Sequence, residues 1–299
     1  MSKQKLNNAT YSIQQLVKRM SKMAYTTRAD TQSTLTRCVK LLHSLGFKLS
    51  HIQGLKTKHV QALVNHWHTQ QLSPATIKNY MAKLRSACHT IGKANLIPPT
   101  NDALHIAKRS YAPKINKAIH SLCLDNITDT HIRLSLTAQQ LFGLRREESM
   151  KLIVSQADKG DYLELQGSWT KGGVTRRIPI TTQAQRAFLD KLHQTIGVGQ
   201  SLIPSHRTYK QQLHRYINQT QQAGLSNLHG LRHAYAQHRY YTLTNELTQG
   251  SGWHCPMQGG PQSKDMSHHQ RNIDYQVRWQ ISQTLGHSRI SITRIYCGK

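Results

Sequence analysis

The stretch NLIPPTND, residues 95–102, divides the chain into two parts with different residue patterns. Its consecutive prolines, Pro98 and Pro99, cannot continue a helix and favour an extended path. A chain of 299 residues is long enough for two domains, because domains usually contain about 100 to 200 residues. We therefore expect a first domain over residues 1–95, a linker over 96–112 and a second domain over 113–299.

The first domain is predicted to be entirely helical. Apolar residues recur at intervals of three and four in the segments 35–45, 60–67 and 77–91. The third of these segments begins at Ser73-Pro74, which combines an N-cap residue with proline at the first helical position. We expect the first helical region to begin near residue 10.

The second domain mixes helical and strand-like patterns. Helical stretches are predicted near 114–153 and again from about residue 182. Between them, in DYLELQGSWTKGGVTRRIPI, alternating residues flank a Gly-Gly turn, which is typical of a β-hairpin. The predicted fold class is therefore mainly α, with a small β-hairpin or sheet in the second domain.

A large positive charge is spread along the whole chain. Forty Lys and Arg residues against 13 Asp and Glu residues give a formal net charge of +27. Such a field favours a polyanionic partner, most simply nucleic acid, although a generically basic ribosome-like protein has the same charge. We assign candidate DNA contacts to five basic residues: Lys78, Lys83, Arg85, Arg176 and Arg177. For the three in the first domain, ordinary solvated surface charge is the alternative.

The sequence contains neither a membrane-span pattern nor a disulfide pattern. No run of about 18 apolar residues occurs, and the polar N-terminus lacks the apolar segment of a signal peptide. The five cysteines are scattered and form no Cys-x-x-Cys pair, so we expect reduced thiols. These features predict a cytoplasmic protein without a membrane partner.

Four motifs in the second domain carry candidate chemistry. In chain order they are FGLRREESMKL with Arg145 and Glu148, Lys171 on the hairpin turn, HGLRH with His229 and Arg232, and LGHSRISITRIY with His287 and Tyr296. Each motif alone has an ordinary structural explanation, such as a local ion pair, a buried histidine or a packed tyrosine.

Together the four motifs resemble the catalytic set of the tyrosine recombinases, the family of phage-type integrases. The residue types, their order and their local spacing match: Lys171 lies eight residues before Pro179, and Tyr296 lies nine residues after His287. The resemblance covers the chain from about residue 114 to its end. It implies a helical core-binding domain followed by a mixed α+β catalytic domain. It also implies a site-specific recombinase of a mobile element that acts in integration or excision.

The chemistry explains these residue types independently. A nucleophile that stays attached to the phosphate conserves the energy of the cut bond, and an aryl oxygen such as that of Tyr296 leaves readily in the reverse step. Charge that grows on the phosphate oxygens needs fixed cations, and a guanidinium makes bidentate contacts that an ammonium cannot. We therefore assign Tyr296 as the nucleophile and Arg145 and Arg232 as the phosphate clamp.

The remaining residues of the set are assigned to proton transfer and orientation. Lys171 is the expected general acid for the departing 5′-oxygen, since neighbouring cations lower the pKa of a lysine. His229 is expected to assist proton movement, and His287 to hydrogen-bond the phosphate. Glu148, one helical turn beyond Arg145, is expected to orient that arginine.

The resemblance also implies partners and the absence of cofactors. It implies no metal, ATP or redox cofactor, because the arginines replace a divalent cation. The implied partners are double-stranded DNA attachment sites, which a C-shaped clamp grips, further copies of the chain in a tetramer that forms on DNA, and accessory DNA-bending proteins. It implies cleavage through a 3′-phosphotyrosyl link, strand exchange through a Holliday junction, and a nucleoid-associated protein of a bacterium or phage.

Two other functions stay open at this point. A type IB topoisomerase-like enzyme would use similar chemistry to relax supercoiled DNA as a monomer, without a particular site. A DNA-binding protein without catalysis, such as a repressor, would not require Tyr296 or Lys171.

The segment 241–275 departs from the family pattern. The interval from Arg232 to His287 is much longer than in familiar members, so we predict an insertion there. Its residues include Trp253, His254, Cys255, His268 and His269. Their spacing matches no standard zinc pattern, and we expect a flexible loop or a segment that contacts DNA, with zinc as the lesser alternative.

The two ends of the chain carry a further expectation. About ten residues precede the first predicted helix, too few for an additional DNA-binding domain, so we expect the minimal two-domain form. Three residues follow Tyr296, and their reach of about 10 Å is too short for a docking helix. We therefore expect a monomer that assembles only on paired DNA sites, with the 241–275 insertion supplying the protein contacts.

Overall fold

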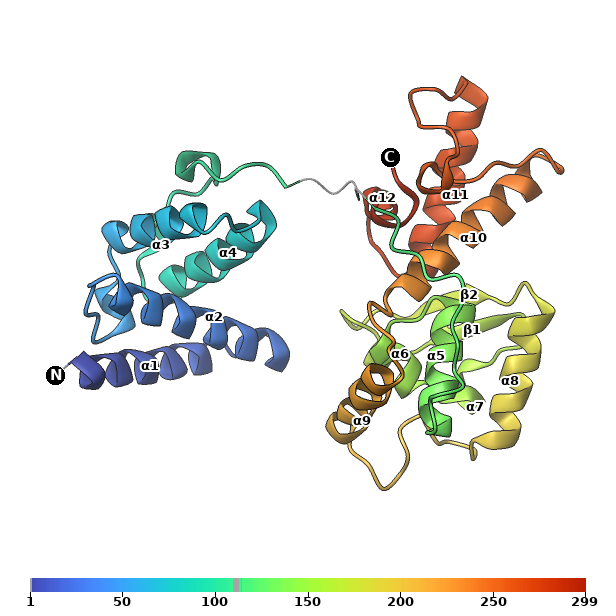
Figure 1. Cartoon of the computed structure of the whole chain (residues 1–299), viewed down its shortest axis with the longest axis horizontal. Helices are drawn as coiled ribbons and strands as arrows, with labels where there is room; N and C mark the ends of the chain where they lie inside the picture. The colour runs from blue at the N-terminus through green and yellow to red at the C-terminus, as the bar shows by residue number, and fades with distance from the viewer. Residues whose placement is uncertain (1, 110–112, 114) are drawn as a thin grey trace. The chain divides into compact units, whose positions relative to one another are not determined.

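The computed structural model describes residues 2–109, 113 and 115–299. The chain divides into a first unit, Met1–Ser110, and a second unit, Tyr111–Lys299. Figure 1 shows the helices and strands of each unit. Each unit has its own hydrophobic core. The expected linker over 96–112 ends on residues 110–112, which lie outside the described residues.

The first unit is built from four longer helices. They are α1 (Ser2–Arg19), α2 (Tyr25–Ser44), α3 (Thr57–Thr69) and α4 (Pro74–Thr90), and short 3₁₀ turns connect or follow them. The start of α4 agrees with the prediction, since the Ser73 hydroxyl accepts a hydrogen bond of 3.2 Å from the Thr76 amide and proline follows the cap.

The expectation that helical structure begins near residue 10 is wrong. Helix α1 begins at Ser2, and its buried apolar residues, Ala9, Ile13, Leu16 and Val17, all lie beyond its first turn. Because the first turn is polar, it carries no apolar period that a sequence pattern would detect.

Two basic residues assigned to DNA contact make polar contacts within the first unit. The Lys83 ammonium lies 2.6 Å from an Asp30 carboxylate oxygen. The Arg85 guanidinium donates to the carbonyls of Pro98 and Thr100, at 3.0 and 3.1 Å, and to the Asn101 side chain. Arg85 therefore holds the segment 98–101, which is a structural role that the helical pattern did not reveal.

The predicted hairpin of the second unit is present. Strand β1 (Tyr162–Leu165) pairs in antiparallel fashion with β2 (Arg176–Pro179), with Leu163 opposite Ile178 and Leu165 opposite Arg176. Leu163, Leu165 and Ile178 are fully buried, so one face of the hairpin packs on the core. The fold is mainly helical with this small sheet, as predicted.

Helices surround the hairpin and carry the rest of the unit. Residues 115–129 are not helical, so the helical stretch predicted near 114–153 is reduced to α5 (Thr130–Phe142) and α6 (Arg146–Lys151). Asp129 caps α5 by accepting a hydrogen bond from the Ile132 amide. The helices are α5 (Thr130–Phe142), α6 (Arg146–Lys151), α7 (Val154–Ala157), α8 (Gln183–Thr195), α9 (Tyr209–Gln222), α10 (Gly230–Leu247), α11 (His268–Thr284) and α12 (Arg294–Cys297).

The 241–275 segment is not a loop throughout, which corrects the expectation. Its ends belong to α10 and α11, which lie side by side (Figure 1). Between these helices Cys255 and Met266 are buried, and the Trp253 indole nitrogen donates to the Tyr240 hydroxyl at 3.3 Å. Apolar burial and this hydrogen bond attach the segment to the core of the unit.

Among the residues that the structure describes, no helix combines the length and apolar character needed to cross a membrane.

Candidate active site

A sharp turn between α5 and α6 places the first arginine. Gly143 ends α5 at a φ of +60°, and a Cβ there would lie 2.4 Å from the Tyr235 ring, so only glycine fits. Arg145 then occupies the N-cap of α6, and Glu148 lies in the first turn of that helix. One Glu148 oxygen accepts a 2.7 Å hydrogen bond from the Arg145 amide, which fixes the spacing of the pair.

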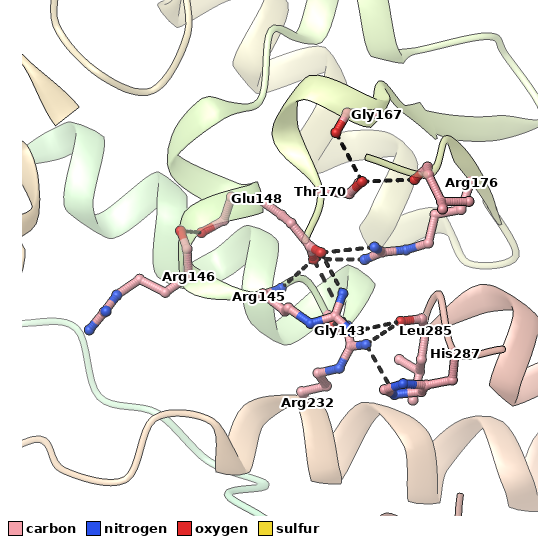
Figure 2. Close-up of polar contacts among 12 residues, drawn as sticks. Gly143, Arg145, Arg146, Glu148, Gly167, Thr170, Arg176, Arg232, Leu285 and His287 are labelled. Carbon is pink, nitrogen blue, oxygen red and sulfur yellow. Dashed lines mark hydrogen bonds and ion pairs between the residues drawn. The ribbon is translucent and has the colours of Figure 1, made fainter. Parts of the chain in front are cut away.

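Glu148 is the buried anion at the centre of the site. Its carboxylate accepts from Arg145 Nη1 at 2.6 Å and from both terminal nitrogens of Arg176 at 2.8 and 2.7 Å (Figure 2). Burial alone would raise the pKa of Glu148, but hydrogen bonds and charge from Arg176 and the charge of Arg145 lower it to about 2. Glu148 is therefore ionised at neutral pH and orients two arginines.

Arg176 is not a surface DNA contact, which corrects its assignment. Side chains alternate along β2, so Arg176 and Ile178 point inward while Arg177 points to solvent and pairs with Glu164. A Cβ at Gly286 would lie 2.9 Å from Arg176 Cδ, so the glycine of the LGH motif leaves space for this arginine. Arg176 thus links the hairpin to Glu148.

Arg232 is fully buried on the first turns of α10. Its Nη1 donates to the Gly143 carbonyl at 2.5 Å, and its Nη2 donates to the Leu285 carbonyl. Burial lowers the pKa of Arg232 to about 10, which still leaves the guanidinium charged at neutral pH. The carbonyls of Gly143 and Leu285, which begin the motifs that carry Arg145 and His287, therefore hold the cation in place (Figure 2).

The hydroxyl of Tyr296 lies between Arg232 and His287. It is 3.4 Å from Arg232 Nε and 3.2 Å from His287 Nε2, and Tyr296 itself is buried in α12. Burial and the charges of Arg232, Arg145 and Arg176 lower the pKa of His287 to about 3, so its imidazole is neutral. Arg232 can only donate, so the His287 Nε2 that faces its Nη2 must be an acceptor. The same nitrogen therefore accepts the hydrogen bond of the Tyr296 hydroxyl.

His229 and His233 lie against the Tyr296 ring without bonding its hydroxyl. Their ring centroids are 6.1 and 4.7 Å from that of Tyr296. Burial lowers the pKa of both, with Arg232 adding to the effect on His229 and His229 adding to the effect on His233, whose pKa falls to about 4. The sequence analysis did not assign His233, although it directly follows Arg232.

Lys171 occupies the turn between β1 and β2 and is exposed. It lines the same cavity of about 560 Å³ as Arg145, Glu148 and His229. Residues of α9 form another wall of this cavity. No hydrogen bond or ion pair engages the Lys171 ammonium among the residues that the structure describes. Arg146 also lines the cavity, and its side chain points away from the Glu148 cluster (Figure 2).

The second unit thus brings all seven candidate catalytic residues around one region. It places fixed cations, a neutral imidazole and a buried phenol together, which is suited to attack on a phosphate diester. Within the described part of the chain, no three His, Cys, Asp or Glu side chains gather so as to hold a metal ion.

Comparison with protein-family models gives two matches in chain order. The model described as "Phage integrase, N-terminal" matches residues 5–97, and the model described as "Integrase" matches residues 105–238. The second match ends before the 241–275 segment, His287 and Tyr296. A comparison with curated proteins finds no match.

Solved recombinase structures have the same fold. A lambda integrase tetramer bound to a Holliday junction is 16% identical, with 80% of this chain and 75% of that chain covered and a TM-score of 0.54. XerH recombinase bound to a palindromic difH substrate is 14% identical, with 96% and 80% covered and a TM-score of 0.55. The Tn1549 transposon integrase with transposon right end DNA is 14% identical, with 95% and 94% covered and a TM-score of 0.51.

The fold and the site define a class of enzymes that break and rejoin DNA. The chain belongs to the tyrosine recombinase family, the phage-type integrases, and is a site-specific recombinase.

Proposed function

We propose that this recombinase cleaves and rejoins duplex DNA through a 3′-phosphotyrosyl intermediate at Tyr296. The observation that carries the proposal is the place of the Tyr296 hydroxyl between Arg232 Nε and His287 Nε2. One neighbour is a permanent cation that attracts an anionic phosphate, and the other is a neutral base that accepts the phenolic proton. Nucleophile and clamp come from one unit of one chain.

The reaction uses the residues in defined roles. The Tyr296 proton passes to His287 Nε2, whose pKa rises when the anionic phosphate offsets the charges of the neighbouring arginines. The phenolic oxygen then bonds to phosphorus as the bond from phosphorus to the 5′-oxygen breaks. Lys171 gives its proton to that departing oxygen, while Arg145 and Arg232 hold the non-bridging oxygens. Attack by a 5′-hydroxyl reverses every step and restores the phosphodiester. We expected His229 to move this proton, but it makes only a ring contact with Tyr296 and no hydrogen bond to its hydroxyl. His229 lines the cavity in which this scheme places the phosphate.

The proposed substrate is a pair of double-stranded DNA sites that four copies of the chain join through a Holliday junction. The formal charge of +27 supports a polyanionic partner, and the lambda integrase tetramer on a Holliday junction supports the assembly. The proposed division of labour assigns residues 1–95 to core-type DNA binding, 96–112 to the linker and 113–299 to catalysis. The Tn1549 transposon integrase supports a role in moving a mobile element.

Covalent trapping tests the proposal. A library of randomised duplexes, nicked close to the possible cleavage position, loses the short 5′-hydroxyl fragment on cleavage and traps the enzyme on DNA. The wild-type chain should give a denaturant-stable adduct on a recovered site, and Tyr296→Phe should give none while it binds that site with unchanged affinity. Adducts without site preference, with relaxation of any supercoiled plasmid, would instead support a topoisomerase. Binding without an adduct would indicate a DNA-binding protein.

A further inference from the structure

Helix α12 carries the nucleophile but is too short to hold it alone. It spans only Arg294–Cys297, and a helix leaves its last carbonyls without partners inside the helix. The carbonyl of Tyr296 is one of these groups. It accepts a 2.9 Å hydrogen bond from the side-chain nitrogen of Gln237, a residue of α10 with no exposed surface.

The Gln237 amide is fixed in turn by Asn116. Gln237 Nε2 donates to Asn116 Oδ1 at 2.8 Å, and Asn116 Nδ2 donates back to Gln237 Oε1 at 3.2 Å. Asn116 also accepts from the Ala118 amide at 3.0 Å and donates to the Met257 carbonyl at 3.4 Å. All four amide hydrogens of the two side chains are used, so a flip of either amide would set oxygen against oxygen.

The segment 116–119 is itself attached to α10, over the turns that carry His229 and Arg232. The Ile119 amide donates to the Gly230 carbonyl at 3.0 Å. A Cβ at Gly230 would lie 2.4 Å from the Lys117 carbonyl, so glycine permits this close approach. Asn116 is therefore held from both sides, by its own segment and by Met257 of the 241–275 segment.

We infer that the Asn116–Gln237 amide pair positions Tyr296 for attack, with Asn116 acting through Gln237. This rests on the function proposed above. A shift in the Tyr296 carbonyl moves the same residue's hydroxyl relative to Arg232 and His287, and misplacement by about 1 Å can cost about 100-fold in rate. Neither side chain touches the reacting atoms, so both are positioning residues.

The experiment measures the rate of covalent adduct formation on the site recovered with the wild-type chain, together with DNA affinity. Gln237→Met keeps the volume but removes the donor, and should slow adduct formation about tenfold or more with affinity changed less than about twofold. Asn116→Ala should slow it by about threefold to tenfold. The double variant should be no slower than Gln237→Met, because Asn116 acts only through Gln237. Gln212→Met is the matched control, since Gln212 is equally buried but bonds Arg207, and its rate should not change.

Several outcomes would overturn the inference. These are a wild-type rate in Gln237→Met, an equal loss in Gln212→Met, and effects that multiply in the double variant. If Gln237→Met fails to unfold cooperatively, Asn116→Ala decides alone, because its position is exposed and tolerates truncation; an unchanged rate then refutes the inference. Absence of an adduct in the wild-type chain contradicts the proposed function instead, so the two failures are distinguishable.

Discussion

The two halves of the candidate active site are built in opposite ways. Of the cations around Glu148, Arg176 and Arg232 are buried and Arg145 is partly buried, and ion pairs and backbone carbonyls hold them in place. Lys171, in contrast, lies on an exposed turn, and nothing in the described part of the chain engages its ammonium. One half is complete without DNA, whereas the other has a free proton donor.

The difference follows from the tasks that we propose for the two halves. A phosphate clamp must not reorganise as charge develops, so burial and fixed partners serve it. A buried cation needs such partners, because desolvation is costly. A general acid must instead lose and regain a proton, and a carboxylate partner would hold its ammonium in the charged form. The predictions below test this division from the largest expected effect to the smallest.

Truncation of the buried clamp should have the largest effect. Arg232→Ala should lower the rate of adduct formation by about 10³-fold or more, because the cation beside the Tyr296 hydroxyl is lost. Arg215→Ala, which removes an arginine bound to Asp129 elsewhere in the unit, is the control and should stay within about threefold. The measurement is single-turnover cleavage, and a small loss in Arg232→Ala would show that the cluster is structural only.

Loss of the proton donor Lys171 should slow cleavage strongly, and a modified substrate should restore the rate. Lys171→Ala should slow cleavage by about 10² to 10⁴-fold. A substrate with sulfur in place of the bridging 5′-oxygen should restore the rate, since a thiolate leaves without a proton. Arg232→Ala and Arg145→Ala should not be rescued, and Lys191→Ala on α8 should behave like the wild-type chain. Rescue of the arginine variants, or of none, contradicts the assignment of Lys171.

Two neighbouring arginines of β2, one buried and one exposed, allow the buried half of the site to be compared with the protein surface. Arg176→Ala leaves Glu148 partly unpaired and should lower the free energy of unfolding by about 3 to 5 kcal/mol and cleavage by about tenfold or more. Arg177→Ala removes only an exposed pair with Glu164, so its unfolding free energy should stay close to that of the wild-type chain. Denaturant unfolding and single-turnover cleavage measure both, and equal effects would refute the inward placement of Arg176.

Low pH should lower the free energy of unfolding through the buried half of the site, by less than the largest loss expected for Arg176→Ala. The pKa of Glu148 is lowered from 4.5 to about 2 in the folded chain, so its contribution is complete above pH 4.5 and is lost as the pH falls towards 2. The contribution of Glu148 to the free energy of unfolding should fall by about 3 kcal/mol over that window, in addition to the losses from Asp129 and Asp158, whose pKa values are also lowered. Glu148→Gln should remove this part of the fall from the stability curve, while Glu147→Gln, at an exposed neighbouring position, should keep it. An unchanged limb in Glu148→Gln would contradict the lowered pKa.

The sequence predicts those parts of the molecule that depend on local patterns. Alternation around Gly172-Gly173 predicts the hairpin, and Ser73-Pro74 predicts the start of α4. The order and spacing of Arg145, Arg232 and Tyr296 predict a site that the structure brings together.

The remainder depends on contacts between distant segments. The carbonyl partners of Arg85 belong to Pro98 and Thr100, outside its helix, and the Asn116–Gln237 pair joins residues far apart in the chain. Arg176 is a different case, because its alternation with Ile178 on β2 was a readable sign that it points inward. The positive charge of Arg176 predicts a DNA contact, whereas the alternation along the strand predicts the inward position that the structure shows.

The central claim is that Tyr296 attacks the phosphate and keeps the 3′ end. The most direct measurement isolates the wild-type adduct, digests its protein and DNA, and locates the remaining nucleotide by mass spectrometry. We predict a nucleotide joined through its 3′-phosphate to Tyr296, with a 5′-hydroxyl on the released strand. A nucleotide on any other residue, or one joined through a 5′-phosphate, would contradict the account.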